Sequence, residues 1–398
     1  MPFPLFQKKW LQLLFILTET KQPIRFLLIS FCFFPLNCCN NKTCVLTIRY
    51  FLRKIFYGFT VIWGIVTLVF LLFNVLPDDP ARLTLGQRSD LASVENVRKE
   101  LNLDKPVGMR YLLYLNDLSP VSLHKNIKDN TAKYKPYLSF HIGKNKELLL
   151  KNPYLGRSYQ SKRLVWDVLS DALPGTIILA FAAIVFATIF GIALGVLAAL
   201  KKDTWLDTSA ILASVAGISA PSFFAGLLIA YIFGYVLSDI TGLSMVGSLW
   251  EYDTFGGRYL SVKNLILPAL TLGIRPLAII TQLTRSSLLD VLSQDYIRTA
   301  YAKGLKKYQV IWRHALPNAL NPVVTAISGW LAELLAGSFF VEFIFSWKGI
   351  GKLTVDSLDK FDFPIVMGAI LITATIFVLV NMLTDLLYTK IDPRIKLR

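Results

Sequence analysis

Charged residues are scarce in this sequence, and cysteine is confined to its N-terminal end. Only 17% of the 398 residues are charged, whereas about 25% is usual for a soluble domain. All four cysteines lie between Cys32 and Cys44, so no disulfide within this chain can brace a loop in the rest of it. The three histidines, His124, His141 and His314, are far from the cysteines, and no spacing of these residues predicts a zinc site.

Motifs of nucleotide binding and of catalysis are also missing. We find no G-x-x-x-x-G-K-[ST] segment and no glycine-rich turn from a strand into a helix, so the chain is not predicted to hydrolyse ATP by itself. No Ser/His/Asp set and no metal-ligand set falls within the apolar segments, which argues against a hydrolase embedded in the membrane. We therefore predict neither an enzyme nor a cofactor or metal site.

Acidic residues are fewer than basic ones, and the formal net charge is +16. Such a balance can indicate nucleic-acid binding. Here, however, the basic residues lie at the ends of apolar segments and in one long loop, rather than among aromatic residues on a soluble face. This distribution is typical of a membrane protein, and we predict no nucleic-acid partner.

Long uncharged runs hold most of the apolar residues, which make up 54% of the chain. Six of these runs are long enough, at about 20 residues, to cross a bilayer as helices. The sequence therefore predicts an all-α polytopic membrane protein. The third run should bend at Pro221, because proline interrupts a helix. The six predicted spans are Ile55–Leu76, Leu173–Leu200, Thr208–Leu237, Leu265–Thr284, Asn318–Val341 and Phe363–Thr384.

The charges of the short loops predict the orientation. Lysine and arginine are frequent before the first span, between spans two and three, between spans four and five, and in the C-terminal tail. Short loops on the other side have mixed charge, for example at Asp356, Asp359 and Lys360. Because positively charged loops stay in the cytoplasm, we predict that both chain ends are cytoplasmic and that the loop 77–172 is extracytoplasmic.

The long loop and the N-terminal segment are the two regions without spans. Within the loop, Ser89–Leu103 and Arg110–Leu118 are predicted to form short helices, and Asn126–Asn152 is a polar, lysine-rich insertion that we expect to be partly ordered at most. Residues 1–46 hold every cysteine and two apolar stretches too short to span a membrane. A cleaved signal peptide is one interpretation, and a mis-assigned translation start near Val45 is the other.

The basic segment 293–317, between spans four and five, carries the most specific pattern. Asp295–Lys303 is predicted to form a helix, with Ser293 as its N-cap. Gly304 suits the left-handed conformation that ends many helices. This predicted helix lies outside the apolar runs, so it is available for contact with lipid headgroups or with another protein.

One face of this predicted helix carries Tyr296, Ala300 and Gly304, which follow one another at intervals of four. The small side chains there would let another protein approach closely. The alternative is that the basic helix binds only lipid, since each lysine or arginine near an anionic membrane surface contributes about 1 kcal/mol.

The same segment resembles the EAA loop of bacterial ABC-importer permeases, which has the form E-A-A, three residues, Gly, and later a Leu-Pro pair. In those permeases the loop is a cytoplasmic helix that docks into the ATPase subunit, so the resemblance implies a chain driven by ATP hydrolysed elsewhere. Arg298 stands where that form has its glutamate. The residues that the resemblance assigns to ATPase coupling are Tyr296, Arg298, Thr299, Ala300, Gly304, Leu316 and Pro317.

From about Thr47 to Arg398 the chain resembles the B-type permease subunit of dipeptide and oligopeptide ABC importers, a binding-protein-dependent transport system inner-membrane component. Asp78 replaces the glycine of that family's L-P-G-D-P segment, and Lys348 replaces the proline of its E-x-I-F-S-W-P-G-[IL]-G segment. The insertion and the N-terminal extension have no counterpart in it. The matching segments are TIRYFLRKIF at 47–56, NVLPDDP at 74–80, LNLDKP at 101–106, EFIFSWKGIG at 342–351 and DPR at 392–394.

That resemblance implies a type I ABC-importer permease with six transmembrane helices in the inner membrane of a bacterium. Its first helix would lie at 47–76, its extracytoplasmic loop domain at 77–172 and its permease core at 173–398. The implied partners are a sister permease in a heterodimer, two ATPase subunits, an extracytoplasmic peptide-binding protein and membrane lipid, and the implied substrates are di- and oligopeptides.

Other transported substrates and another transport class are the alternatives. Close relatives of this subunit serve nickel, glutathione and other small solutes, so the substrate class stays open at this point. An ion-coupled secondary transporter would usually show internal repeats with broken helices, and we find no convincing repeat among the six predicted spans.

Two ionisable residues fall within predicted spans, Arg275 in the fourth and Glu333 in the fifth. A charge at the centre of a membrane helix costs about 2.5 to 3.5 kcal/mol on insertion scales, so each residue should face a partner or a cavity. The depths of the two residues differ by about 3 Å along their helices. One interpretation is an ion pair between them. The other is that they line the translocation path, where Arg275 would hold the carboxylate of a peptide.

Overall fold

A computed structural model gives the fold of residues 44–74, 104–124, 138–141, 147–253 and 257–391. The chain divides into two compact units, Met1–Tyr50 and Phe51–Arg398, and the contacts described below belong to the second. The segment 1–43, the predicted helix Ser89–Leu103 and the DPR segment at 392–394 lie outside the described residues.

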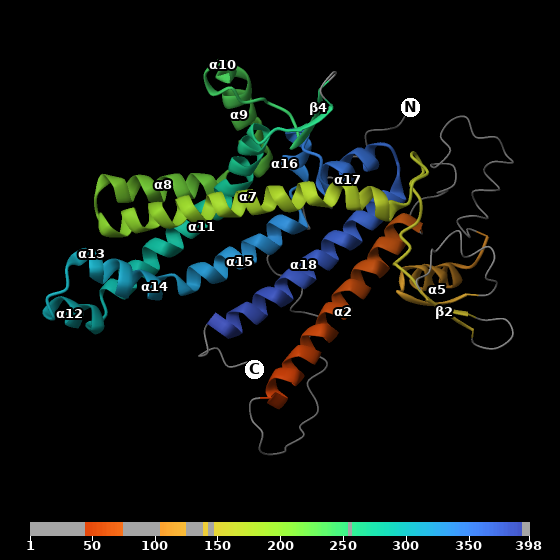
Figure 1. Ribbon diagram of the computed structural model, residues 1–398, viewed down its shortest axis with the longest axis horizontal. Coiled ribbons are helices and arrows are strands. Elements are labelled where there is room, and N and C mark those ends of the chain that lie inside the picture. Colours follow the sequence, from red (N-terminus) through yellow and green to blue (C-terminus); the bar gives the residue numbers. More distant parts are fainter. Residues whose placement is uncertain (1–43, 75–103, 125–137, 142–146, 254–256, 392–398) are drawn as a thin grey trace. The chain divides into compact units, whose positions relative to one another are not determined.

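Helices make up most of the described chain (Figure 1). The long ones are α2 (Cys44–Asn74), α7 (Val165–Leu200), α11 (Lys263–Leu292) and α18 (Phe363–Ile391). The shorter α-helices are α5 (Val107–Leu118), α8 (Trp205–Ser219), α9 (Ser222–Tyr231), α10 (Ser238–Thr241), α12 (Asp295–Ala302), α13 (Lys307–Gln309), α14 (Leu316–Ala319), α15 (Asn321–Ala336), α16 (Phe339–Ile344) and α17 (Ile350–Asp359). Two π-helices are η3 (Ile232–Val236) and η4 (Val310–Ala315).

Among the described residues, four helices are long and apolar enough to cross a membrane, and two bent pairs of helices pass the same test together. By length and composition the described chain therefore holds four to six spans. In the first pair, α8 meets α9 and η3 at 109°. The break lies at Ala220 and Pro221, between the two helices, so the bend predicted at Pro221 is confirmed. In the second pair, the run from α13 to α14 meets α15 at 50°.

Several helix ends differ from the ends of the predicted spans, and the fifth and second spans are examples. The fifth predicted span ran to Val341, but α15 ends at Ala336, and a separate short helix, α16, begins at Phe339. The second was predicted to begin at Leu173, but α7 begins at Val165. Its polar first turns are helical because Val165 and Leu169 pack in an apolar cluster with residues of α17 and α18.

Glycines of α7 let it pack closely along α11. A Cβ added at Gly191 would lie 2.8 Å from Cγ2 of Ile280, and one added at Gly195 would lie 2.6 Å from Cβ of Thr284. Small residues at such positions allow two membrane helices to approach backbone to backbone. The α7–α11 contact is the centre of the bundle, and α8 and α15 also pack against α11.

The first predicted span, α2, lies along α18 (Figure 1). Nζ of Lys54 is 2.5 Å from Oδ2 of Asp385, and the rings of Phe73 and Phe363 are 5.3 Å apart. Between these two contacts, the backbone of Gly58 lies against Val378. The two helices therefore run side by side over most of the length of α2.

The segment after α2 contains one helix and a small sheet. The helix predicted at Arg110–Leu118 is confirmed as α5, and the rings of Tyr111 and Tyr114 of α5 pack at a tilt against Phe70 of α2, with ring centroids 5.1 and 5.6 Å away. In the sheet, β3 pairs antiparallel with both other strands, and Leu150 lies opposite Val121. The strands are β1 (Val121–His124), β2 (Leu138–His141) and β3 (Glu147–Leu150), and a separate hairpin pairs β4 (Trp250–Asp253) with β5 (Gly257–Leu260).

Candidate functional site

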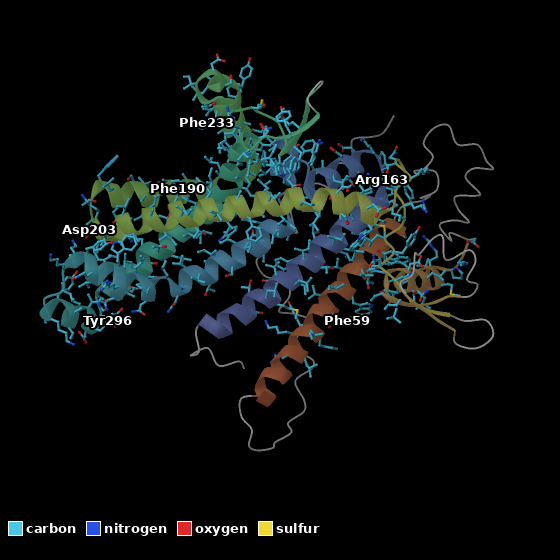
Figure 2. All side chains as sticks on the ribbon, viewed as in Figure 1. Phe59, Arg163, Phe190, Asp203, Phe233 and Tyr296 are labelled. Carbon is cyan, nitrogen blue, oxygen red and sulfur yellow. The ribbon has the colours of Figure 1, made fainter. Side chains whose placement is uncertain are left out.

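The described bundle has two ends with different structures. We call the end that carries α12 and the α7–α8 loop the α12 end, and the end that carries α16 and α17 the α16 end. Figure 2 shows Asp203 and Tyr296 near one end of α7 and Arg163 at the other.

Two buried residues fasten α12 to the bundle. Ile297 is 1% exposed and Ala300 is 7% exposed, and a spacing of three puts them on one helix face. Their apolar cluster contains Val196, Ala199, Leu288, Ile297, Ala300, Val310, Ala315, Leu316 and Ala319. Because these residues come from α7, α11, α12, η4 and α14, the short helix shares one core with the ends of two long helices.

The start of α12 differs from the prediction. The backbone of Ser293 is still helical, with φ −82° and ψ −10°, and its Oγ donates to the carbonyl of Asp290 at 2.7 Å. Ser293 therefore closes α11, and the prediction that it caps α12 is wrong. Gln294 occupies the N-cap position, without a side-chain hydrogen bond to the helix.

The end of α12 is a left-handed turn, as predicted at Gly304, whose φ is +79°. The N–H of Gly304 donates to the Tyr301 carbonyl at 2.9 Å, and the N–H of Leu305 donates to the Ala300 carbonyl at 3.3 Å. These two bonds form a Schellman motif, which satisfies carbonyls that the helix leaves without partners. The turn therefore fixes the direction in which the chain leaves α12.

The predicted coupling residues divide into an outward set and a buried set. The outward-facing residues are Tyr296, Arg298, Thr299, Gly304 and Pro317, and the buried ones are Ala300 and Leu316. The argument that Ala300 offers a small surface to another protein is therefore wrong, because its own chain covers it. The small side chain instead lets α12 pack closely on the cluster beneath it.

Asn318 joins α12 to α14 and was missed by the sequence analysis. Its Nδ2 donates to Oη of Tyr296 at 3.0 Å and to the carbonyl of His314 at 2.9 Å. Because Asn318 directly follows Pro317 in α14, this contact ties the start of α12 to the Leu-Pro pair. The Leu-Pro pair therefore helps to fix the position of α12.

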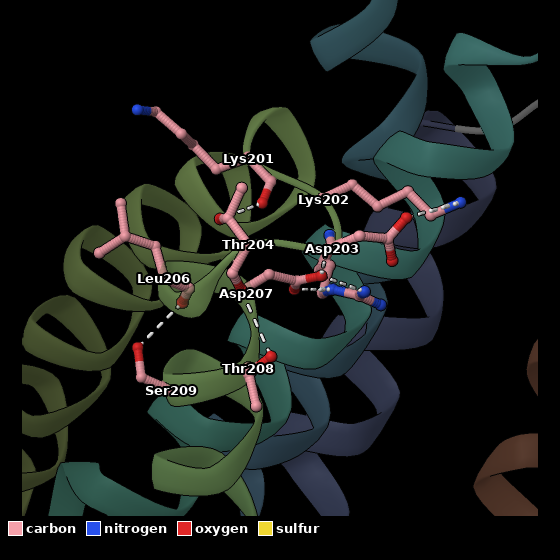
Figure 3. A network of polar contacts seen from close by, with 9 residues as sticks. Lys201, Lys202, Asp203, Thr204, Leu206, Asp207, Thr208 and Ser209 are labelled. Atoms are coloured by element: carbon pink, nitrogen blue, oxygen red, sulfur yellow. Dashed lines mark hydrogen bonds and ion pairs between the residues drawn. The ribbon is translucent and has the colours of Figure 1, made fainter.

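An ion pair holds the α7–α8 loop against α11 (Figure 3). Arg285 donates from Nε to Oδ1 of Asp207 and from Nη2 to Oδ2 at 2.7 Å. The N–H of Asp203 also donates to Oδ2 at 3.1 Å. The Asp207 side chain is only 4% exposed. Sequence reasoning missed this pair, although an acid so close to the start of an apolar span needs a partner.

At the α16 end, the EFIFSWKGIG segment folds around its own first residue. Glu342 is fully buried. Its Oε1 accepts hydrogen bonds from the hydroxyls of Thr176, at 2.8 Å, and Ser338, at 2.6 Å. Its Oε2 accepts from the N–H groups of Gly351, at 2.7 Å, and Lys352, at 3.1 Å. Burial raises the pKa of Glu342, and these four bonds act in the opposite direction.

The same segment is seated on the start of α7. Trp347 is 1% exposed, and its Nε1 donates to the carbonyl of Gly175 at 2.9 Å. A Cβ at Gly175 would lie 2.0 Å from the carbonyl oxygen of Lys348, so only glycine fits there. The segment that resembles the permease signature therefore joins α7 to the α16–α17 turn.

A second buried carboxylate lies at the same end. Asp362, 2% exposed, accepts hydrogen bonds from Oγ of Ser158 at 2.5 Å and from the N–H of Tyr159 at 2.9 Å. The N–H of Gln160 is 3.3 Å from Oδ2. Asp362 directly precedes α18, so it ties the segment before α7 to the start of the last long helix.

Arg275 and Glu333 are both exposed, on α11 and α15. Among the hydrogen bonds and ion pairs of the described residues, none joins the two. The direct pair is thus not seen, and the path-lining interpretation stays a proposal. In the described part of the chain, no group of three or more His, Cys, Asp and Glu residues is placed to hold a metal ion.

Comparison with known families matches almost all of the chain after residue 46. Residues 191–397 match the family described as binding-protein-dependent transport system inner membrane component. Residues 47–180 match the N-terminal region of the same kind of protein. The two matches together include most of α2 and α7, the α12 loop and the EFIFSWKGIG segment.

Several named relatives match over most of their length. The dipeptide transport system permease protein DppB of Alkalihalophilus pseudofirmus is 33% identical over 88% of this chain and 99% of its own length. DppB of Escherichia coli is 34% identical over the same shares. The glutathione transport system permease protein GsiC of Pectobacterium atrosepticum is 33% identical, again over 88% and 99%.

Proposed function

This chain belongs to the family of binding-protein-dependent transport system inner-membrane components, and we propose that it is the subunit through which an ABC importer moves peptides. It is a multi-pass inner-membrane permease of such an importer, so its function requires ATPase subunits and a binding protein. The observation that carries the transport role is α12, a short exposed helix that shares an apolar core with the ends of α7 and α11.

The proposed substrates are di- and oligopeptides. Relatives named for dipeptide and di/tripeptide transport are 33% and 35% identical to this chain. Glutathione is the second candidate, because permeases named for glutathione transport are 33% identical over a similar share of the chain. Uptake of labelled di-, tri- and longer peptides and of glutathione into a strain lacking this gene would separate the two candidates.

The proposed mechanism begins with α12. Its outward face, with Tyr296, Arg298 and Thr299, would dock into an ATPase subunit, while its inward face stays fixed to the core through Ile297 and Ala300. Closure of the ATPase subunits would then move α12 together with α7 and α11 as one body. Such a rigid movement would open the pathway toward the binding protein.

The remaining partners and the orientation belong to the same proposal. The complete importer would contain a sister permease as a heterodimer and two ATPase subunits. The α12 end would lie in the cytoplasm, because its loops carry the basic residues. The α16 end and the sheet of β1 to β3 would then face the peptide-binding protein.

Charge reversal on the outward face of α12 tests this mechanism. Arg298→Glu should lower peptide uptake and the amount of ATPase subunit that co-purifies by about tenfold, since Arg298 is exposed and has no role in the core. Lys201→Glu is the matched control, because Lys201 is also exposed at the α12 end but lies in the α7–α8 loop. Normal uptake in Arg298→Glu, or an equal loss in Lys201→Glu, would remove the support for docking through α12.

A further inference from the structure

Arg275 lies near the middle of a membrane-spanning helix, yet it is exposed on the surface of the chain. Counted from Lys263 and Leu292, the two ends of α11, it lies about 18 Å and about 26 Å deep. An arginine at such a depth is costly against lipid. Its guanidinium group therefore requires water, a partner subunit or a substrate beside it.

The α11 face that carries Arg275 is mostly polar from this residue to the α12 end. Residues that recur at intervals of three and four share a helix face, and this one points away from α7, which α11 contacts through Gly273 and Ile280. Most of its members have polar side chains, and none is fully buried. These members are Arg275, Ile279, Gln282, Ser286 and Asp290.

The neighbouring helix α15 exposes a similar face. Four of its exposed residues follow at intervals of four and have small or polar side chains: Asn321, Thr325, Gly329 and Glu333. The opposite side of α15 is apolar and packs on α7 and α11. Because two adjacent spans expose polar faces, a water-filled path along them explains these polar residues better than contact with lipid does.

The backbone beside Arg275 adds an independent polar group. Pro276 has no N–H, so it cannot donate the helical hydrogen bond that the carbonyl of Leu272 would otherwise accept. Backbone groups without helical partners at membrane depth are tolerated where protein or a water-filled cavity covers them. The α11 backbone therefore has an interruption at the level where the charged side chain lies.

Resting on the proposed peptide-import function, we propose that Arg275 binds the free carboxylate of the substrate as it passes along this polar face. The guanidinium group presents parallel N–H donors that match a carboxylate. Every unmodified peptide ends in a carboxylate, so one such contact serves peptides of different length and side chains. The same residue would repel a bare metal cation.

Uptake of matched substrates tests the proposal. The assembled importer with its binding protein is given a labelled dipeptide and its C-terminally amidated analogue, and the acid-to-amide uptake ratio is compared between wild type and Arg275→Gln. The binding protein is the same for wild type and variant, so its own preference for the acid or the amide cancels when the two ratios are compared. We expect uptake of the acid to fall about tenfold or more in the variant, as for the loss of a charge-assisted pair, and uptake of the amide to change little.

The possible results of this experiment are distinct. Unchanged uptake of the acid, or an equal loss of acid and amide in an assembled importer, overturns the proposal. If Arg275→Gln does not assemble, the acid-to-amide uptake ratio is measured in Arg275→Lys instead. This variant keeps the charge but loses the paired donors, so its ratio should be lower than that of wild type but higher than the ratio expected for Arg275→Gln. If the wild-type importer moves neither peptide, it is the proposed function that fails.

Access to position 275 provides a measurement that does not depend on transport. In a chain whose four native cysteines are replaced by serine, Arg275→Cys is treated with a charged methanethiosulfonate reagent in inside-out vesicles. We expect the cysteine at position 275 to be labelled. Leu379→Cys is the control, because Leu379 is an exposed apolar residue of α18 and should stay unlabelled. If the Arg275→Cys chain stays unlabelled as well, a water-accessible path at this residue is contradicted.

Discussion

The α12 end and the α16 end are both fixed by buried acidic residues, but in different ways. At the α12 end, Asp207 pairs with the cation of Arg285, and the buried residues of α12, Ile297 and Ala300, pack in an apolar cluster. At the α16 end, no cation meets Glu342 or Asp362 among their described hydrogen bonds. Those carboxylates accept from hydroxyls and backbone N–H groups instead.

This difference fits the two tasks proposed for the ends. Hydrogen bonds to one carboxylate are directional, so the network of Glu342 holds the α16–α17 turn in a single shape. Apolar packing has no such direction, and it leaves the outward face of α12 free to bind a partner. The charged pair of Asp207 and Arg285 then joins the start of α8 to α11 without using that face.

Breaking the charged pair should have the largest effect. Asp207→Leu would leave the Arg285 cation without its partner, which for a buried pair costs about 3 kcal/mol or more of unfolding free energy. The double variant Asp207→Leu with Arg285→Leu should recover much of this loss, because no charge is stranded. Thermal unfolding of the purified chain measures both. A double variant no more stable than Asp207→Leu would show that the pair is not the stabilising contact.

Removing the acceptor at the α16 end should have a smaller effect. Glu342→Leu leaves two N–H groups and two hydroxyls without an acceptor, but it strands no charge, and the hydroxyls can rotate to other partners. We expect the unfolding free energy of Glu342→Leu to be about 2 kcal/mol lower than that of wild type. Glu342→Gln keeps the shape of the side chain and one acceptor oxygen, so its stability should lie between those of wild type and Glu342→Leu. If Glu342→Leu costs as much as Asp207→Leu, the distinction between the two ends is wrong.

The pH dependence should also distinguish the α16 end. Because burial raises the pKa of Glu342, the folded chain binds this proton more tightly than the unfolded chain, whose glutamate pKa is about 4.3. The contribution to stability is therefore complete below that value and is lost as pH rises through the folded pKa. The unfolding midpoint of wild type, relative to that of Glu342→Gln, should therefore fall as the pH rises from 4. A difference that is constant with pH contradicts the prediction.

Local sequence signals predicted the parts of the α12 end that depend on neighbouring residues. The helix at Asp295 and its left-handed end at Gly304 follow from residues close in the chain, and so does the bend at Pro221 at the other end of α8. The inward direction of Ala300 could not be predicted, because it depends on Val196 and Leu288 in other helices. Ser293 was misassigned because α11 continues to Leu292, eight residues beyond the predicted span, which leaves Ser293 with helical backbone angles.

The α16 end was less predictable for the same reason. The sequence marked Glu342 only as part of a resemblance, since its donor Thr176 lies 166 residues earlier. The strands β1 to β3 also escaped prediction. Each has four residues, which is too short for an alternating pattern, and they pair across a lysine-rich segment. Pairing at a distance, rather than local preference, decides both features.

The smallest expected change in stability concerns Gly304, where the effect on transport should exceed the effect on folding. Nothing lies within 4 Å of a Cβ added there, so Gly304→Ala meets no clash, but a positive φ of 79° costs a residue with a side chain about 1 kcal/mol. Relief of that strain would turn the chain leaving α12 and misalign its outward face. We therefore expect near-normal unfolding but clearly reduced uptake and ATPase association. Gly64→Ala is the matched control, because Gly64 also has open space around its Cβ position but lies within helix α2, where alanine suits the backbone. Equal uptake in the two variants would mean that the direction of α12 does not limit coupling, and that the α12 end tolerates more change than its shared core indicates.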